Sequence, residues 1–436
     1  MEKSQILDIL NDWNFWRKNP DTGIKRENII KKIRELSKSK EIAVIKGIRR
    51  SGKSTSLLQF CKELIDSGVK KESILIINFE DPRFEDLNLE LLNRIYEIYL
   101  TELRPDEKHF VILDEVQVID GWEKFARFLH ENKKINVFVT GSSSKLLDSE
   151  YSTVLAGRHL DLEIKPLSFR EYLSFKNIEI KNNLDISNKR HQIKSELKEY
   201  MLKGGFPKVV LTKSEAQKKE ILETYFRDII IKDIVKRFKV REIEKLESLA
   251  KYYLTNVSTL QSFNNIKNVL KINLDTVERF SYYFTTVFLL NFIKKFSYSE
   301  KEQIFNPRKI YCADTGLRNS VAFVFSEDWG RLAENIVFNK LNKTENEVYY
   351  WKNEKQEEVD FIIKRGKKDL QAVQVCWNIE KLETQEREII SIIKACKELR
   401  LKEGLILTED AEKENKIEGI RITFKPIWKW LLENEF

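Results

Sequence analysis

The sequence predicts an α/β protein whose N-terminal part carries a parallel β-sheet with helices on both faces. Five segments are expected to be strands, and the first four are short apolar runs bounded by turns or charges: residues 42–46, 74–79, 110–113, 135–140 and 160–164. Segments with helical patterns lie between them: residues 55–67, 87–103, 122–132 and 145–155. Strands that alternate with helices are typical of a parallel sheet with both faces covered.

The middle of the chain predicts helices followed by a small mixed unit. The pattern is helical from residue 168 to about 255, with a break at Gly204-Gly205-Phe206-Pro207. Three helices and a strand are expected over residues 242–296, and Asn273 is expected to cap the third helix, with Thr276 and Arg279 on its surface. A hairpin of residues 287–296 and 303–311 completes the element order of a winged helix-turn-helix.

The last part of the chain predicts a second, smaller α/β unit. It should begin with a helix, continue with strands at residues 347–351, 358–363 and 370–377, and end with a further helix and strand. A chain of 436 residues suits two to four domains. We therefore expect four: residues 1–165, 166–241, 242–312 and 313–436.

Composition excludes several classes of protein. With 42% hydrophobic residues, 14 Gly and 7 Pro, the chain is neither wholly disordered nor collagen-like. Its net charge of +8 permits contact with nucleic acid without arguing for it. The four Cys and four His form no zinc-binding pattern. The longest uncharged run, residues 281–293, is too short to span a membrane, and no signal peptide is visible, so we expect a cytoplasmic protein.

One loop carries a complete phosphate-binding motif. Residues 47–54, GIRRSGKS, fit G-x-x-x-x-G-K-S/T, follow the first strand and open the next helix. Backbone N–H groups of such a loop surround phosphates, Lys53 would bind the β- and γ-phosphates, and Ser54 would ligate Mg²⁺. The expected nucleotide-binding residues are Gly47, Ser51, Gly52, Lys53, Ser54 and Thr55. Arg49 and Arg50 are expected either to contact phosphate or a partner, or to be solvated loop charges.

The third predicted strand ends in a pair of acids that complements this loop. In FVILDE, residues 110–115, Asp114 would bind Mg²⁺ and Glu115 would orient and polarise the attacking water. The fourth strand should lie between this strand and the first one. At its tip Ser142 is the chosen sensor of the γ-phosphate, with Thr140 and Ser143 as close competitors; a helix N-cap is the alternative.

Arg158 is the last catalytic candidate, because it stands just before the fifth strand. In oligomeric ATPases of this build, that place projects an arginine into the nucleotide of the neighbouring subunit, where its charge stabilises the transferred phosphoryl group. The alternative is a surface arginine that pairs with Asp161 or Glu163.

These motifs resemble a known family over nearly the whole chain. GIRRSGKST, VILDEVQ, TGSSS, LAGR before PLSFREYL, YCADTGLRN and EVDFIIKRG are similar to those of archaeal and bacterial predicted ATPases of the AAA superfamily. These ATPases carry a C-terminal domain of unknown function. The resemblance implies ATP binding, a helical lid near residues 166–171, a winged helix and a terminal domain with a restriction-endonuclease-like fold.

A nuclease core of that type needs an acid on a first helix, an Asp at a strand end and E-x-K on the next strand. Glu334 and Asp360 match the two acids, whereas Gln374 and Cys376 replace the Glu and the Lys. Gln is a neutral ligand and Cys supplies no ammonium to polarise the water. We therefore expect a binding scaffold with a degenerate site, and the alternative is an active nuclease.

The overall interpretation is an Mg²⁺-dependent, ATP-hydrolysing switch or motor that acts on DNA or on a DNA-bound partner. A basic stretch near the winged helix could contact phosphate backbones, although such runs are more often solvated: Lys232, Lys236, Arg237, Lys239 and Arg241. The alternatives are a nucleotide-gated switch that binds a protein client without nucleic acid, and an ATP-dependent nuclease. Homo-oligomers are expected if Arg158 acts between subunits, and a membrane is not expected as a partner.

Overall fold

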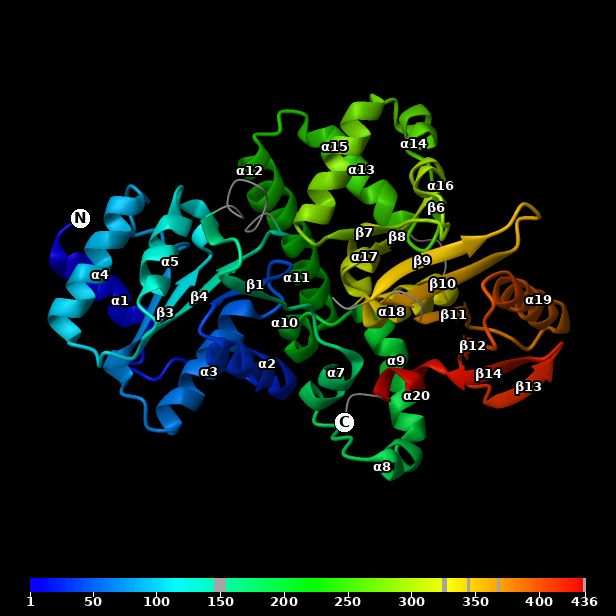
Figure 1. Ribbon diagram of the computed structural model, residues 1–436, viewed down its shortest axis with the longest axis horizontal. Helices are drawn as coiled ribbons and strands as arrows, with labels where there is room; N and C mark the ends of the chain where they lie inside the picture. The colour runs from blue at the N-terminus through cyan, green and yellow to red at the C-terminus, as the bar shows by residue number, and fades with distance from the viewer. Residues whose placement is uncertain (145–153, 324–327, 343–345, 367–368, 434–436) are drawn as a thin grey trace. The chain divides into compact units, whose positions relative to one another are not determined.

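The computed structural model describes residues 1–144, 154–323, 328–342, 346–366 and 369–433 (Figure 1). The chain forms two compact units. Unit 1 comprises Met1–Lys165 with Thr286–Phe288, and unit 2 comprises Pro166–Thr285 with Leu289–Phe436. The finer division into four domains stays a prediction.

Unit 1 contains the predicted parallel sheet, whose five strands run in the order β2-β3-β4-β1-β5. Every neighbouring pair is parallel. The strands are β1 (Ile42–Lys46), β2 (Ile74–Asn78), β3 (His109–Asp114), β4 (Ile135–Gly141) and β5 (His159–Glu163). The expected strands are therefore confirmed to within about a residue at each end, and β4 lies between β1 and β3, as expected.

Helices cover both faces of this sheet because β1 is apolar on both of its faces. Ala43 and Ile45 pack with α2 (Glu27–Ser39) and α3 (Lys53–Asp66). Ile42 and Val44 lie in the opposite core, with α1 (Lys3–Trp13), α4 (Leu89–Leu103) and α5 (Trp122–Glu131) (Figure 1). Of the helix predicted over residues 145–155, only residues 154–155 are described, and these are helical. The sequence analysis did not foresee α1 and α2.

The first part of unit 2 is helical, as predicted. Its elements are α7 (Phe169–Phe175), α8 (Asn183–Asn188), α9 (Arg190–Lys203), α10 (Pro207–Leu211), α11 (Glu215–Asp228), the π-helix η4 (Ile229–Val235) and α12 (Lys236–Phe238). The predicted break separates α9 from α10. There the carboxylate of Asp314 accepts the Gly205 N–H at 2.6 Å and caps α17 (Thr315–Val321) through the Leu317 N–H at 2.9 Å. One buried acid thus joins the GGFP and ADTGL segments.

Three helices and the two hairpin strands follow in the predicted order, and a short strand that was not predicted lies between the first two helices. They are α13 (Ile243–Thr255), β6 (Leu260–Gln261), α14 (Phe263–Leu270), α15 (Leu274–Thr286), β7 (Leu290–Ile293) and β8 (Arg308–Cys312). Two expectations were wrong. Residues 303–305 are not a strand but the end of α16 (Glu300–Phe305), which Ser299 caps. Thr276 is buried, because α15 turns it toward the core together with Val277 and Phe280.

The last part of the chain is built on a mixed six-stranded sheet in the order β13-β14-β12-β11-β10-β9. The strands are β9 (Glu347–Lys352), β10 (Glu358–Arg365), β11 (Asp369–Cys376), β12 (Glu403–Thr408), β13 (Lys413–Ile417) and β14 (Ile420–Pro426). One face packs on α19 (Leu382–Glu398). The other packs on α18 (Trp329–Leu341) and α20 (Ile427–Leu432). Among the described residues, no helix is both long and apolar enough to cross a membrane.

Candidate functional site

The phosphate-binding loop lies where the sequence predicts it, between the C-terminal end of β1 and the start of α3. Two glycines give the loop its shape. Gly52 adopts φ 98° directly before α3, and Gly47 adopts φ 147°. A Cβ atom at Gly47 would lie only 2.1 Å from the carbonyl oxygen of Ile164, so no other residue fits there without moving the backbone.

Lys53 and Ser51 place two buried donor groups at this loop. Lys53 is 3% exposed, and its ammonium donates to the Gly47 carbonyl at 3.1 Å and lies 3.4 Å from Glu115 Oε1. The Ser51 hydroxyl is fully buried and has no hydrogen-bond partner within the described residues. A buried ammonium and a buried free hydroxyl fit an anionic phosphate. Thr55, the remaining candidate in the loop, is exposed.

The two predicted magnesium ligands, Ser54 and Asp114, are hydrogen-bonded to each other at the end of β3. Asp114 Oδ1 accepts hydrogen bonds from Ser54 Oγ at 2.9 Å and from Thr140 Oγ1 at 2.6 Å. Burial, and next the charge of Glu115, raise the pKa of Asp114 to about 6. A hydroxyl and a carboxylate are oxygen ligands of the kind that Mg²⁺ prefers. The pair therefore fits this ion.

Glu115 is placed as a charged base beside the loop. The residue adopts a left-handed conformation with φ 56°, and its N–H donates to Thr140 Oγ1 at 2.9 Å. Gln117 Nε2 donates to Glu115 Oε2 at 2.6 Å. Burial acts to raise the pKa of Glu115, but the Lys53 charge and the Gln117 hydrogen bond offset it and hold the pKa below its ordinary value. A carboxylate held in the charged form can accept a proton from water.

Thr140 connects both acids at the tip of β4. Its hydroxyl donates to Asp114 and accepts from the Glu115 backbone, so it joins both acids. Ser142 and Ser143 follow it and are buried, with at most 1% of their surface exposed. The sequence analysis ranked Ser142 first as sensor and Thr140 as a competitor. The contacts favour Thr140 as the residue that positions the acids, and the sensor role of Ser142 stays a prediction.

Replacing Thr140 by Val tests this position. The side chain keeps its shape but loses both hydrogen bonds, so Asp114 and the Glu115 backbone lose their common support. We expect turnover to fall by about 10- to 100-fold and the Mg²⁺ requirement to rise, as when groups that orient metal ligands are removed. Magnesium titrations of ATP hydrolysis measure this. Thr140→Ser should retain activity, and a Val variant with wild-type magnesium dependence would contradict the role.

Two arginines beside the loop have roles that the motifs do not indicate. Arg49 is buried and pairs with Glu80 at 2.7 Å, so the interpretation of Arg49 as a solvated charge was wrong. Arg26 is also buried, and its guanidinium donates to the Ser51 carbonyl at 2.9 Å and to the Lys165 carbonyl at 3.1 Å. Arg26 therefore ties the loop to the segment that follows β5. It lies in an irregular stretch without a motif, and no sequence signal pointed to it.

Arg158 lies at the N-terminal end of the parallel strands, whereas the loop follows the C-terminal end of β1. Its carbonyl accepts the N–H of Ile42, the first residue of β1, whereas the loop follows the last. The length of the five-residue strand β1, about 15 Å, separates these two ends. Of the alternative partners, Asp161 pairs instead with Lys46 at 2.6 Å. No ion pair of Arg158 with Asp161 or Glu163 is present within the described part of the chain.

The four candidates of the terminal domain lie near one another, but a lysine that was not predicted stands among them. Lys309 of β8 contacts Asp360 at 2.7 Å, Glu358 at 2.8 Å and Glu334 at 2.9 Å. Tyr311, two residues further along β8, donates to Glu334 Oε1 at 2.6 Å. Burial, and next the charge of Asp360, raise the pKa of Glu334 to about 8.

The contacts of Gln374 and Cys376 do not indicate that either side chain binds a metal ion. Gln374 accepts the Asp360 N–H at 3.0 Å and donates to Glu388 at 2.6 Å, so both ends of its amide are engaged. The Cys376 thiol donates to the Asn378 carbonyl at 3.3 Å. Burial, and next the charge of Glu388, raise the pKa of this thiol to about 12, which keeps it protonated. The ammonium that lies beside the acids comes from Lys309, 67 positions before Cys376 in the chain.

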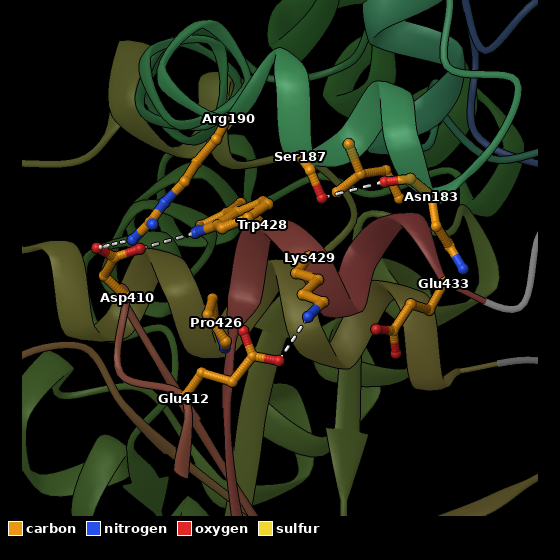
Figure 2. Close-up of a pocket in the computed structure, with 10 residues that line it drawn as sticks. Asn183, Ser187, Arg190, Asp410, Glu412, Pro426, Trp428, Lys429 and Glu433 are labelled. Atoms are coloured by element: carbon orange, nitrogen blue, oxygen red, sulfur yellow. Dashed lines mark hydrogen bonds and ion pairs between the residues drawn. The ribbon is translucent and has the colours of Figure 1, made fainter.

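A separate surface cavity of about 780 Å³ lies between α8, α9 and α20 (Figure 2). Four of its charged side chains pair with one another, and Glu433 pairs with Lys425. Arg190 pairs with Asp410 at 2.6 Å, Trp428 donates to the same carboxylate at 3.2 Å, and Lys429 pairs with Glu412. None of the residues predicted from the motifs lines it, and we assign it no role.

Three family models match successive parts of the chain. Residues 39–173 match the family described as AAA domain, residues 194–328 a domain of unknown function (DUF8612), and residues 329–430 a second one (DUF4143). An uncharacterized protein of Methanocaldococcus jannaschii, MJ1544, is 35% identical over 90% of this chain and 88% of its own length. One from Haemophilus influenzae is 28% identical over 94% and 99%. Among solved structures, the Walker-type ATPase PABY2304 of Pyrococcus abyssi is similar, with a TM-score of 0.41 and 17% identity over 71% of this chain and 99% of that one.

Proposed function

Because the chain belongs to a family of archaeal and bacterial proteins that join an AAA ATPase domain to C-terminal domains of unknown function, we propose that it hydrolyses ATP with Mg²⁺. One observation carries the proposal. Lys53, Glu115, Thr140, Asp114 and Ser54 form an unbroken chain of contacts at the mouth of the phosphate-binding loop. A phosphate ligand, a proton acceptor and a pair of magnesium ligands thus stand next to one another.

Each of these residues has a separate role in the proposed reaction. Lys53, Ser51 and the N–H groups at the start of α3 bind the phosphates. Ser54 and Asp114 would hold Mg²⁺, which neutralises phosphate charge when bound. Glu115 accepts a proton from a water molecule whose oxygen attacks the γ-phosphorus, while the bond from that phosphorus to the β–γ bridging oxygen breaks. The products are ADP and inorganic phosphate.

Phosphate release from ATP by the purified full-length chain tests this function. We expect multiple turnovers with Mg²⁺ and none when the metal is removed with EDTA, because Ser54 and Asp114 act only through a cation. A chain that binds ATP but releases no phosphate at any protein concentration would contradict hydrolysis. That outcome would favour the nucleotide-gated protein switch.

Arg158 is proposed to act on the nucleotide of a neighbouring subunit. It lies at the N-terminal end of the strands, about 15 Å from the loop of its own chain, and this position supports action in trans. We expect Arg158→Ala to bind ATP normally and to hydrolyse it about 1000-fold more slowly, within the range for such arginines. Arg158→Lys should be only partly active, because it lacks the planar guanidinium.

Mixing two inactive variants tests whether Arg158 acts between subunits. Lys53→Ala lacks a working loop but keeps Arg158, whereas Arg158→Ala keeps the loop. Mixed assemblies of the two should recover part of the wild-type turnover, because some sites combine an intact loop with an intact arginine. Turnover per wild-type chain that does not change with protein concentration, across any assembly transition, would exclude action in trans.

DNA is the client that we propose for this ATPase. Four basic side chains between η4 and α13 are exposed to solvent, and we call them the basic segment: Lys232, Lys236, Lys239 and Arg241. Only Lys232 has an ion-pair partner within the described residues, Asp228 at 3.0 Å. The third helix of the expected winged helix-turn-helix, α15, is less suitable, because Asp275 and Glu278 lie exposed beside Arg279. Phosphate contacts by the basic segment are therefore expected to dominate over base contacts.

Binding to a short duplex at several salt concentrations separates DNA from a protein client. Replacing the basic segment by Gln should weaken binding and reduce the slope of log affinity against log salt by about 1 per residue. The matched control replaces four exposed lysines at α2 and lowers the net charge equally: Lys31, Lys32, Lys38 and Lys40. Equal losses in both variants, or no binding by the wild type at low salt, would favour the protein-interaction switch.

A further inference from the structure

The Lys309 cluster is a second group of ionisable side chains, well away from the phosphate-binding loop in sequence. We define it as Lys309, Glu334, Glu358 and Asp360. Three acids from α18 and β10 each place an oxygen within 2.9 Å of the Lys309 nitrogen. Lys309 itself is 2% exposed. Burial lowers the pKa of Lys309, but Asp360 and Glu334 more than offset this and hold it well above the ordinary value.

The cluster has the acids of a metal site but not the room for a metal ion. A divalent cation among carboxylates needs oxygen atoms at about 2.0–2.6 Å around one open position. Here the ammonium already occupies the point to which all three acids converge. The second Asp360 oxygen accepts the Val375 N–H at 2.8 Å, and Glu334 Oε1 also accepts the Tyr311 hydroxyl. Within the described residues, no group of three or more His, Cys, Asp or Glu side chains is arranged to hold a metal ion.

The fold keeps the ammonium in this position. Lys309 is the second residue of β8, the middle strand of its sheet, and is paired on one side with Leu260 of β6 and on the other with Ile293 of β7. Tyr311 stacks on Phe338 of α18, with ring centroids 4.2 Å apart. Strands on both sides and a buried aromatic pair fix the backbone, so the lysine cannot leave by a loop movement.

We propose that Lys309 is a built-in cation that replaces a divalent metal ion at this cluster. The ammonium joins β8 to α18 and β10 through its contacts with the three acids. In a metal site, bonds between the acids and the metal ion would make this connection. The terminal domain then keeps the acids of a nuclease-like site without the metal that phosphodiester cleavage needs. The second positive group near the cluster is Lys352, 3.6 Å from the outer oxygen of Glu358.

Manganese binding, followed by electron paramagnetic resonance on the full-length chain without nucleotide, tests the proposal. All variants carry Asp114→Asn, which removes the predicted metal ligand of the phosphate-binding loop. In this background we expect no Mn²⁺ at the cluster. Adding Lys309→Met should create a site, so that the variant binds Mn²⁺ at least tenfold more tightly than the Asp114→Asn parent does. Adding Asp360→Asn as well should remove this site. Lys352→Met is the matched control and should create no site.

Thermal unfolding gives a second readout. Lys309→Met leaves the buried Glu334 and Asp360 and the half-buried Glu358 without their shared cation, so it should unfold at a lower temperature than its parent and regain stability with Mn²⁺. The parent should show no such gain. If Lys309→Met does not fold even with Mn²⁺, the titration of its parent decides alone: no binding supports the proposal, and binding that Asp360→Asn removes overturns it. A folded Lys309→Met that binds no Mn²⁺ also overturns it. None of these measurements contains ATP, so their outcome is independent of hydrolysis.

Discussion

Replacing Glu115 by Gln is expected to slow ATP hydrolysis by at least about 100-fold while ATP binding is retained, as when a general base is removed. The amide oxygen of the new side chain can still accept the hydrogen bond from Gln117, so the local structure should persist. The amide cannot accept a proton from water. It also no longer attracts Lys53, whose ammonium lies 3.4 Å from the Glu115 carboxylate in the wild type. Lys53 is then freer to bind phosphate, and ATP affinity should be equal to that of the wild type or higher.

Two measurements on the Glu115→Gln variant separate the steps. Equilibrium binding of a labelled ATP in the presence of Mg²⁺ reports affinity, and single-turnover phosphate release reports the chemical step. Glu107→Gln is the matched control, because Glu107 is an exposed carboxylate of the same unit that pairs with Lys134. Its turnover should equal that of the wild type. Full hydrolysis by Glu115→Gln would exclude Glu115 as the base.

The sheet and the loop could be predicted because their signals are local. β1 is buried on both faces, so its sequence is a continuous apolar run, and the loop and the helix α3 follow it without a gap. Residues 303–305 were assigned to the wrong element because a short capped helix interrupts the hairpin, and Ser299 was not recognised as its cap. Thr276 was placed on the surface because a single polar residue on a helix does not show which face is covered.

Contacts between distant segments could not be predicted in the same way. Arg26 reaches the Lys165 carbonyl across 139 positions, and no pattern within its own segment shows this. The terminal domain gives the clearest example. Gln374 and Cys376 lie two positions apart on β11, and the sequence shows that the usual lysine is missing there. It could not show that β8 brings Lys309 to the same acids, because that depends on how separate elements pack.

Replacing Lys53 by Met is expected to reduce ATP affinity by about 100-fold, which corresponds to about 3 kcal/mol. Met keeps the aliphatic part of the side chain and removes the charge. The buried ammonium is the group best placed to form charge-assisted hydrogen bonds with phosphate, since the other buried cation of the loop, Arg49, is engaged with Glu80. Lys62→Met is the matched control, because Lys62 lies exposed on the same helix, and its ATP affinity should not change.

The Lys53 variant also disturbs Glu115, and this effect must be separated from the loss of phosphate binding. Without Lys53 the buried Glu115 carboxylate loses its main compensating charge and keeps the Gln117 hydrogen bond and the charge of Arg49, so Lys53→Met should lower the unfolding temperature of unit 1. The double variant Lys53→Met/Glu115→Gln removes the unpaired charge and should recover most of that stability. It should not recover ATP affinity, because no ammonium is restored. If the double variant bound ATP as tightly as the wild type, Lys53 would serve only as the partner of Glu115 and not as a phosphate ligand.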